Sequence, residues 1–501
     1  MSECVDLLII GGGVNGAGIA RDASGRDLSV LMCEKDDLAE GTSSRSGKLV
    51  HGGLRYLEYY EFRLVREALI EREVLLNAAP HIIWPMRFVL PHSPLDRPAW
   101  LIRLGLFLYD HLGGRKRLPG TRKLDLHRDP EGAPILPEFR IGFEYSDCWV
   151  DDARLVVLNA MGARENGATI LPRTECVSLS SEGDIWRATL RNRVDGSERR
   201  IKAKVVVNAA GPWVNDIIGR VAGTNSRRTV RLVKGSHIVV PKFWDGQQAY
   251  LVQNTDKRVI FINPYEGDKA LIGTTDISYD GPPEEVAADQ SEIDYLIAAV
   301  NRYFKQKLTP EDVLSTFSGV RPLFDDGKGD PSAVTRDYML DVDQSRGVPI
   351  LNIFGGKITT YRKLAEHAVD KLKPYLPGMG TSWTAGAPLP GGDMADADFE
   401  NFLGDVLRKY PWLPKQLAKH YVRLYGTRMG EIVGAATSLD GLGLHFGGLL
   451  YEAEVRYLAT QEWASCAEDV LQRRTKHGLH LSANAQKSLE RWFDRKLAKS
   501  A

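Results

Sequence analysis

Residues 6–34 read DLLIIGGGVNGAGIARDASGRDLSVLMCE, and this stretch decides the fold. Residues 6–10 form a short apolar run that predicts a buried parallel strand, and residues 28–33 form a second run that ends on Glu34. A glycine turn and the small, helix-compatible residues 17–24 lie between the two runs. Strand, glycine turn, helix, strand and acid within about 30 residues predict a βαβ unit that binds a dinucleotide.

The glycine turn satisfies the GxGxxG pattern with Gly11, Gly13 and Gly16. Gly11 permits the tight turn, Gly13 lets the backbone approach a pyrophosphate, and Gly16 lets the helix pack on the strand. The N-terminus of the helix then presents free N–H groups to the phosphates. Glu34 stands where a carboxylate accepts hydrogen bonds from a ribose. The alternatives are a glycine turn without a ligand and, for Glu34, a solvated charge at a strand end.

The next segment, residues 40–56 (EGTSSRSGKLVHGGLRY), favours FAD over NAD. Thr42, Ser43 and Ser44 supply hydroxyl groups directly after the second strand, which suits a loop around a bulky, extended cofactor. A nicotinamide enzyme more often continues into another βαβ unit. The alternative, a flexible polar loop, is disfavoured by the apolar residues embedded in the segment.

Two later segments support a flavin. Residues 204–213 (KVVVNAAGPW) predict a strand whose end, Ala-Ala-Gly, lies against a ligand or a close backbone. Residues 350–363 (ILNIFGGKITTYRK) predict a strand, a Gly-Gly turn and a helix that begins near Thr359. A helix N-terminus aimed at the flavin stabilises the negative charge that develops when the flavin is reduced.

The rest of the chain divides into two parts by its pattern. Up to residue 388 the pattern mixes helices with strands, and the alternation over residues 178–207 predicts antiparallel strands with a turn near Asp195 and Gly196. We therefore predict an α/β body, 1–388, in which a Rossmann-like FAD unit and a mixed, antiparallel substrate-binding sheet are interleaved. An all-α C-terminal cap, 389–501, follows, with helices predicted over 399–410, 415–425, 452–464 and 485–497.

Composition excludes several classes of protein. The 65 basic residues balance 65 acidic ones, so a net charge of zero argues against a non-specific nucleic-acid binder. The five cysteines form no CxxC pair, so neither a disulfide framework nor a zinc site is indicated, we predict no metal, and a reducing compartment fits best. Because acids and no cationic region precede the first short apolar run, we expect no signal peptide, and no apolar stretch reaches the ~20 residues that span a bilayer.

Several motifs together resemble the aerobic, FAD-dependent sn-glycerol-3-phosphate dehydrogenases of bacterial respiratory membranes. The resemblance covers nearly the whole chain and rests on GGGVNGAGIARDAS, TSSRSGKLVHGGLRYLEYYEFRLVREAL, FEYSDCWVDDARLV, NAAGPWV, KGSHIVVP, IGTTD, SGVRPL, TRDY and FGGKITTYRKLAEHA. It implies a fold like that of glycine oxidase and D-amino acid oxidase. It also implies oxidation of glycerol 3-phosphate to dihydroxyacetone phosphate on FAD, with electrons passed to a membrane quinone. The implied assembly is a homodimer bound peripherally to the cytoplasmic face of the inner membrane.

The resemblance also implies which residues contact the cofactor. They come from the glycine turn, the hydroxyl-rich loop and the two later strand ends. We expect the FAD site to comprise Gly11, Gly13, Val14, Asn15, Gly16, Glu34, Thr42, Ser43, Ser44, Lys48, Gly52, Val177, Ala210, Gly211, Gly356, Lys357 and Thr359.

A phosphorylated polyol needs cations at one end of the pocket and the flavin at the other. Because an Arg fork matches phosphate oxygens, Arg321 and Arg336 are the favoured anchors, with Arg55 and Lys357 as further candidates. For each, a solvated or salt-bridged charge is the alternative, and the resemblance is what favours a site. Tyr56 either hydrogen-bonds the substrate or packs in the core.

Oxidation of a secondary alcohol needs a base for the hydroxyl proton, and histidine is the usual choice. His51 and His237 both lie in motifs expected near the flavin, and we favour His237, with Arg55 and Arg321 stabilising the alkoxide. His51 is then a structural histidine, but the sequence does not decide between them.

Residues 98–109 (PAWLIRLGLFLY) carry one charge and precede a basic cluster at 115–123. The segment either lies in a membrane interface or forms a buried helix beside a solvated loop. Two rival functions also remain, a flavin-dependent amine or amino-acid oxidase on the same fold and a non-catalytic flavin-binding protein.

Overall fold

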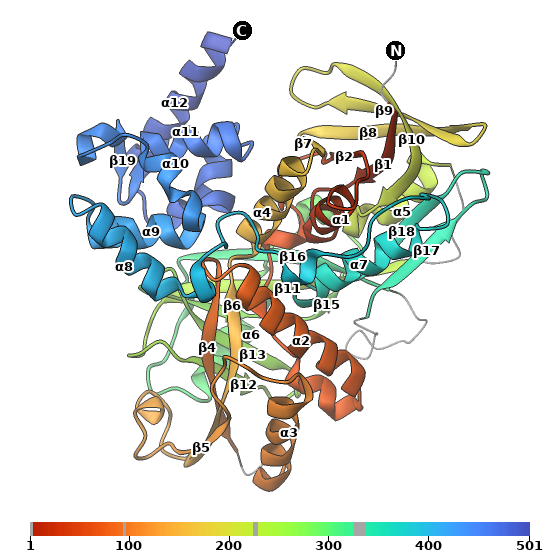
Figure 1. Ribbon diagram of the computed structural model, residues 1–501. Helices are drawn as coiled ribbons and strands as arrows, with labels where there is room; N and C mark the ends of the chain where they lie inside the picture. Colours follow the sequence, from red (N-terminus) through yellow and green to blue (C-terminus); the bar gives the residue numbers. More distant parts are fainter. Residues whose placement is uncertain (1–3, 94–96, 224–228, 325–336, 501) are drawn as a thin grey trace.

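The computed structural model describes residues 4–93, 97–223, 229–324 and 337–500, with side chains up to residue 495 (Figure 1). A mostly parallel sheet lies near the N-terminus in space, and a second, mostly antiparallel sheet lies beneath it in the view of Figure 1. A group of C-terminal helices packs beside the first sheet. The predicted fold class, α/β with a helical C-terminal part, is confirmed.

The first sheet contains the predicted βαβ unit. Its parallel strands lie in the order β18-β10-β1-β2-β7, and helix α1 connects β1 to β2. Both faces of these strands are covered, which explains why their sequences are continuous apolar runs rather than alternating ones. The elements are β1 (Cys4–Ile10), α1 (Val14–Ser24), β2 (Val30–Cys33), β7 (Thr169–Leu171), β10 (Glu198–Asn208) and β18 (Ile350–Phe354).

Antiparallel strands join this sheet at the β18 edge and beside the N-terminal half of β10. The predicted turn at Asp195 and Gly196 joins β9 to β10, and Arg191 pairs with Glu198 across it. The added strands are β8 (Thr174–Glu182) and β9 (Ile185–Asn192), which continue from β10, and β17 (Met339–Asp343), which pairs with β18.

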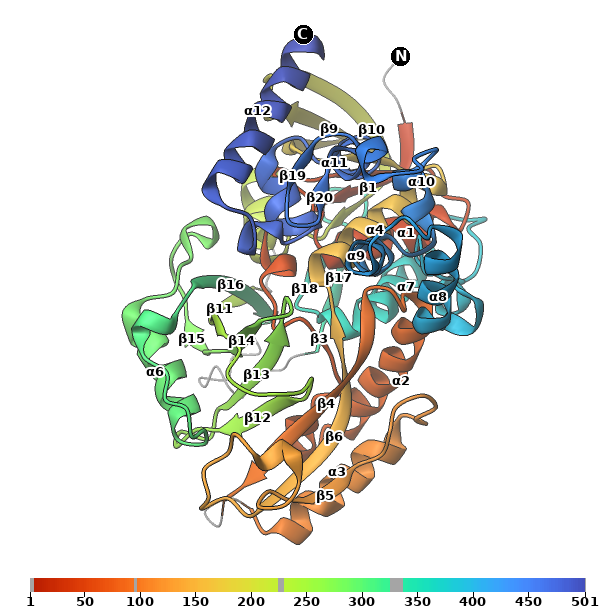
Figure 2. The same cartoon turned by 90° about the vertical axis from the view of Figure 1, so that its left-hand side faces the viewer.

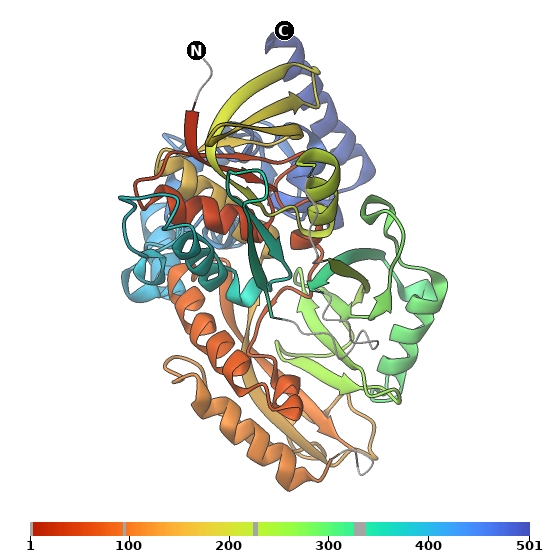
Figure 3. The ribbon, with the colours of Figure 1, turned by 90° about the vertical axis from the view of Figure 1, so that its right-hand side faces the viewer.

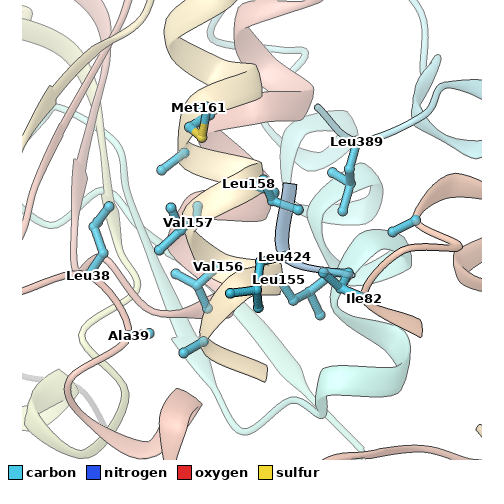
Figure 4. Close-up of a cluster of buried hydrophobic side chains, with 14 of the residues drawn as sticks. Leu38, Ala39, Ile82, Leu155, Val156, Val157, Leu158, Met161, Leu389 and Leu424 are labelled. Atoms are coloured by element: carbon cyan, nitrogen blue, oxygen red, sulfur yellow. The ribbon is translucent and has the colours of Figure 1, made fainter. Parts of the chain in front are cut away.

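Helices α1, α4 (Asp152–Glu165) and α7 (Tyr361–Lys371) pack together over one face of the first sheet. Helix α4 is buried along almost its whole length. Figure 4 shows Leu155 and Leu158 of α4 among side chains from distant segments, including Leu389 and Leu424. One apolar core therefore continues from the sheet through α4 into the C-terminal helices.

The second sheet follows the order β15-β11-β14-β13-β12-β4-β6-β3, with β16 beside β11 and β5 beside β6 (Figure 2). Alternate residues of β11 face opposite layers: Ile238 and Val240 share a core with α6, whereas Val239 shares one with α2 and α3. The elements are β3 (Leu49–Val50), α2 (Phe62–Ala78), β4 (Ile83–His92), α3 (Ala99–Leu112), β5 (Arg122–Asp125), β6 (Ile141–Val150), β11 (Val230–Pro241), β12 (Ala249–Gln253), β13 (Val259–Tyr265), β14 (Lys269–Gly273), β15 (Ile277–Ser278), α6 (Gln290–Asn301) and β16 (Ser315–Phe324).

The C-terminal part is helical, as predicted, and also contains one small hairpin (Figures 1 and 3). A buried ion pair joins it to the body, because Arg154 Nη2 of α4 donates to Glu462 Oε1 at 2.9 Å. The domain boundary near residue 389 stays a prediction. The elements are α8 (Phe399–Lys409), α9 (Lys415–Tyr425), α10 (Met429–Val433), β19 (His445–Gly447), β20 (Leu450–Tyr451), α11 (Glu452–Gln461) and α12 (Ala483–Ser500).

Helix α3 is not the fully buried helix that the sequence left open. Leu106 and Tyr109 are buried, but Trp100, Leu104 and Phe107 are 68%, 47% and 57% exposed. The helix lies at the end of the molecule opposite α12 in all three views (Figures 1, 2 and 3). Among the described residues, no helix combines the length and the apolar character needed to span a membrane.

Candidate active site

Three parallel strands end at the same level. Ile10 of β1 is in register with Asn208 of β10, which is in register with Asn352 of β18. The loops that follow these ends line a cavity of about 900 Å³, whose other wall comes from the second sheet. Ligand sites in open α/β sheets lie at such carboxyl ends.

The glycine turn closes tightly and leaves its backbone accessible. Gly11 has φ +112°, and a Cβ there would lie 2.5 Å from the carbonyl oxygen of Ala209. A Cβ at Gly16 would lie 1.9 Å from the carbonyl oxygen of Gly11, so the helix packs too closely for any side chain. Gly13 faces the cavity and has only the hydroxyl of Ser43 within 4 Å of such a Cβ. A diphosphate therefore has room against the N-terminus of α1.

Glu34 ends β2 and lines the cavity. Its carboxylate accepts hydrogen bonds from the backbone N–H groups of Gly12, at 2.6 Å, and Asp36, at 2.8 Å. Burial raises the pKa of Glu34 to about 7 despite these hydrogen bonds. The carboxylate is thus held rigidly where a ribose would present its hydroxyls.

The hydroxyl-rich loop is fixed from both sides. The hydroxyl of Thr42 donates to the carbonyl oxygen of Val320 at 2.5 Å, and Ser43 Oγ accepts from the N–H of Val14 at 3.0 Å. Thr42 and Ser43 both line the cavity. The loop is anchored from beneath by Lys48, which is buried and lies 2.8 Å from Asp152.

The third loop, after β18, carries Gly355 and Gly356 with φ +79° and +107°. Asn15 Nδ2 donates to the carbonyl oxygen of Gly355 at 3.2 Å, and Asn15 Oδ1 is buried without a partner among the described residues. Thr359 accepts a hydrogen bond from the backbone N–H of His51 at 3.2 Å, which joins this loop to the hydroxyl-rich segment.

Eight basic residues line the cavity, among them Arg45, Arg55, Arg321 and Lys357. Arg321 forms an ion pair with Asp276 and donates to the hydroxyl of Thr274 at 3.0 Å. Within the described part of the chain, Arg45, Arg55 and Lys357 have no carboxylate at ion-pair distance. Lys357 Nζ lies 4.0 Å from the ring centroid of Tyr56, a cation–π contact. The cavity therefore suits an anionic ligand beyond the dinucleotide.

The two histidines have different surroundings. His237 on β11 is 3% exposed, and its ring stacks on Phe317 with centroids 4.8 Å apart. Burial, together with the nearby cations Arg321 and Lys48, lowers the pKa of His237 to about 3. His51 is half-buried, and its ring contacts Phe261 edge-on at 5.9 Å. Both rings line the cavity.

Most of the expected site residues line this one cavity. They are Gly11, Gly13, Val14, Asn15, Glu34, Thr42, Ser43, His51, Arg55, Tyr56, Ala210, Gly211, His237, Arg321, Gly356, Lys357 and Thr359.

Five expected cofactor residues do not line the cavity. Gly16 packs under the turn. Lys48 and Ser44 bind each other instead, because Lys48 Nζ donates to the carbonyl oxygen of Ser44 at 3.0 Å. Gly52 donates through its N–H to the hydroxyl of Tyr109 at 2.7 Å. Val177 lies at a bulge of β8, while its neighbour Cys176 reaches the cavity. Among the expected substrate residues, Arg336 lies outside the described residues.

The polar residues of the cavity wall that sequence reasoning missed include Arg45, Asn263, Thr274 and Asp276. Arg45 sits inside the quoted TSSR motif, and the placement of a cation directly after three hydroxyl residues was the available signal. Asn263 lies on β13, with Oδ1 buried and without a partner among the described residues. No local pattern marks it, because only the pairing of the second sheet brings β13 to the cavity.

Two family models match the chain. The model described as FAD dependent oxidoreductase matches residues 6–362, and the model of the C-terminal domain of alpha-glycerophosphate oxidase matches residues 382–495. The resemblance identified from the motifs is thereby confirmed.

Individual relatives cover nearly the whole chain. D-erythritol 1-phosphate dehydrogenase of Brucella abortus is 68% identical over 492 residues, which are 98% of this chain and 98% of that protein. The aerobic glycerol-3-phosphate dehydrogenase of Escherichia coli is 50% identical over 492 residues, 98% of this chain and 97% of that one. The crystal structure of glycerol-3-phosphate dehydrogenase from Bacillus halodurans with FAD matches with a TM-score of 0.80 at 29% identity, covering 99% of this chain and 91% of that chain.

We predict that Glu34→Ala weakens FAD binding at least tenfold, because each lost hydrogen bond to a charged group contributes about 1.5–3 kcal/mol. The matched control is Glu58→Ala, which removes a cavity-wall carboxylate that pairs with Arg97 instead of the glycine turn. The recovery of flavin fluorescence on dilution measures the dissociation constant. Equal affinity for FAD in both variants would contradict a ribose contact at Glu34.

Proposed function

The chain belongs to the family of FAD-dependent oxidoreductases, and on that premise we propose that it oxidises an acyclic polyol phosphate to the corresponding keto phosphate. The observation that carries the proposal is a cavity lined both by the dinucleotide loops and by cations without carboxylate partners. In the reaction the carbinol carbon loses a hydride and its hydroxyl loses a proton, which makes two electrons in all. FAD supplies the acceptor for the hydride when it is bound.

The cofactor is held by this chain's own backbone and carboxylate. The glycine turn and the N-terminus of α1 receive the diphosphate, and Glu34 receives the ribose. In the loop after β18, Gly356 and the start of the η8 turn (Ile358–Thr360) line the cavity, where they would face the flavin ring. N–H groups there stabilise negative charge that develops during the reaction.

Arg55 and Lys357 bind the phosphate of the substrate in this proposal. Arg55 Nε is buried without a hydrogen-bond partner among the described residues, and Lys357 is held over the ring of Tyr56. A dianion between these side chains satisfies the buried donor and neutralises both charges. An amino-acid oxidase needs only one cation for a carboxylate, so the surplus of cations disfavours that alternative.

His51 takes the hydroxyl proton in this proposal, although the sequence favoured His237. A pKa of about 3 makes His237 a weak proton acceptor and keeps its imidazole neutral. Arg321, fixed by Asp276 and Thr274, is placed to stabilise the alkoxide that forms as the proton leaves. His237 is then a neutral hydrogen-bonding group at the same centre.

D-erythritol 1-phosphate and sn-glycerol 3-phosphate are both candidate substrates, because each has a carbinol next to a phosphomethyl group. The relative with 68% identity acts, by its name, on D-erythritol 1-phosphate, whereas relatives near 50% act on glycerol 3-phosphate. We propose D-erythritol 1-phosphate as the preferred substrate and sn-glycerol 3-phosphate as the second candidate.

We further propose that the reduced enzyme passes its electrons to a membrane quinone. We also propose that the protein is a homodimer that docks on the cytoplasmic face of the membrane. The exposed side chains of α3, Trp100, Leu104 and Phe107, support a peripheral contact with lipid. Leu101 and Leu104 of α3 also line the cavity, so a membrane contact through α3 would place the cavity beside the lipid surface.

We expect anaerobic addition of D-erythritol 1-phosphate to bleach the visible flavin band of the purified protein. The value of kcat/KM should exceed that for sn-glycerol 3-phosphate by about tenfold or more, the discrimination that one extra carbon allows. Erythritol and glycerol without phosphate are the controls and should leave the band unchanged. A band that persists with both phosphates would overturn the proposed reaction, and a preference for the three-carbon substrate would reverse the order of the two candidates.

We predict that His51→Asn lowers the rate of flavin reduction by a factor of roughly 100 or more, the usual contribution of a general base. His237→Asn should lower it less, and the two variants should retain FAD equally. Stopped-flow reduction at several pH values checks this. If His237→Asn lowers the rate of flavin reduction more than His51→Asn does and abolishes its pH dependence, His237 is the base.

We predict that Phe107→Asp weakens binding to vesicles of phosphatidylethanolamine and phosphatidylglycerol by about tenfold or more, since burial of a Phe side chain contributes roughly 1.5–3 kcal/mol. The control is Val194→Asp, at a residue 72% exposed in the turn between β9 and β10. Co-sedimentation at low salt measures the partition. Unchanged binding of Phe107→Asp would exclude α3 from the membrane contact.

A further inference from the structure

Three potential metal ligands converge in the C-terminal part, away from the cavity. His420 lies on α9, Glu454 on α11, and His477 begins the η14 turn (His477–Leu479). One ligand atom from each residue lies within 4.8 Å of the other two. In the part of the chain that the structure describes, this is the one group of three or more such residues.

The hydrogen bonds of the cluster leave acceptors unused. Glu454 Oε1 accepts from the hydroxyl of Tyr425 at 2.6 Å and lies 2.8 Å from His420 Nε2. Glu454 Oε2 and His477 Nε2 are buried and have no hydrogen-bond partner among the described residues. Glu454 is 0% exposed and His477 is 4% exposed. Unpaired buried acceptors of this kind cost free energy unless a ligand satisfies them.

The charge of the cluster is also unbalanced. Among the described residues, the only basic group at ion-pair distance from the Glu454 carboxylate is His420. The rings of His420 and His477 lie with their centroids 4.8 Å apart. An imidazole nitrogen can offer a lone pair, so the cluster presents two imidazoles and one buried carboxylate to a cation.

We infer that His420, Glu454 and His477 bind one divalent zinc ion, with a water molecule as the fourth ligand. Two imidazoles and one carboxylate are a donor set that zinc accepts in tetrahedral geometry. Ligand atoms around zinc lie about 3.3 Å apart at Zn–N distances of about 2.0–2.1 Å. Closure around zinc shortens the largest separation, 4.8 Å, by about 1.5 Å, and the His420 side chain, 10% exposed, leaves a path from solvent.

The cysteine count pointed away from zinc, because sequence patterns for zinc rely on closely spaced ligands. Here the ligands are 34 and 23 residues apart and meet only through packing. The ion joins α9, α11 and the segment after them. The neighbouring Lys476 binds Asp151 at 2.6 Å, at the start of α4, so the site would also stiffen the contact between the helices and the body.

The test uses the full-length, FAD-loaded protein without a histidine tag. After treatment with a chelator and gel filtration, titration with zinc chloride should show one zinc per chain and an increase in Tm. Glu454→Gln and His477→Asn should each weaken zinc binding by at least about tenfold, with FAD content unchanged. His445→Asn, an exposed histidine of the same region, is the control and should bind zinc like the parent protein.

X-ray absorption at the zinc edge on the parent protein keeps the inference falsifiable if a variant fails to fold. We expect four nitrogen and oxygen ligands, two of them imidazole. A parent protein that binds no stoichiometric zinc, a spectrum with sulfur ligands, or variants that bind zinc as tightly as the parent would overturn the site. These measurements do not depend on flavin reduction by a polyol phosphate, so the zinc site and the proposed function can fail separately.

Discussion

The register of three parallel strands is the constraint on which the site depends. Hydrogen bonding places Ile10, Asn208 and Asn352 side by side, and Asn208 Nδ2 donates to Asn352 Oδ1 at 2.9 Å inside the sheet. A slip of one residue would turn every side chain to the other face and separate the loops that follow. The glycine turn, the Ala-Ala-Gly end and the Gly-Gly loop share one cavity only because of this alignment.

Buried charges fix the loops once the strands have aligned. Lys48 binds Asp152 beneath the hydroxyl-rich loop, and Lys476 binds the adjacent Asp151 from the C-terminal part. Both carboxylates lie at the start of α4, so one helix end connects the cofactor loop to the helical part. Because a buried ion pair is costly to break, loss of one partner there would disturb the loop and the domain contact together.

The sequence predicted the fold and the loops that carry the dinucleotide side of the cavity wall, because apolar runs and glycines act locally. The βαβ unit follows from residues 6–34, and α9 covers the predicted 415–425. The roles of Asn263 and of the cluster His420, Glu454 and His477 could not be predicted, since each depends on which distant strands or helices become neighbours. The weak basicity of His237 was equally hidden, because it comes from burial and from Arg321 and Lys48, which no motif records.

A crystal structure of the FAD-loaded protein with D-erythritol 1-phosphate tests the central claim most directly. The account predicts the phosphate between Arg55 and Lys357, and the hydroxyl next to the phosphomethyl group within hydrogen-bond distance of His51. The diphosphate of FAD should lie against Gly13, with Glu34 on the ribose. A phosphate bound away from Arg55 and Lys357, or a carbinol facing away from both histidines, would contradict the account.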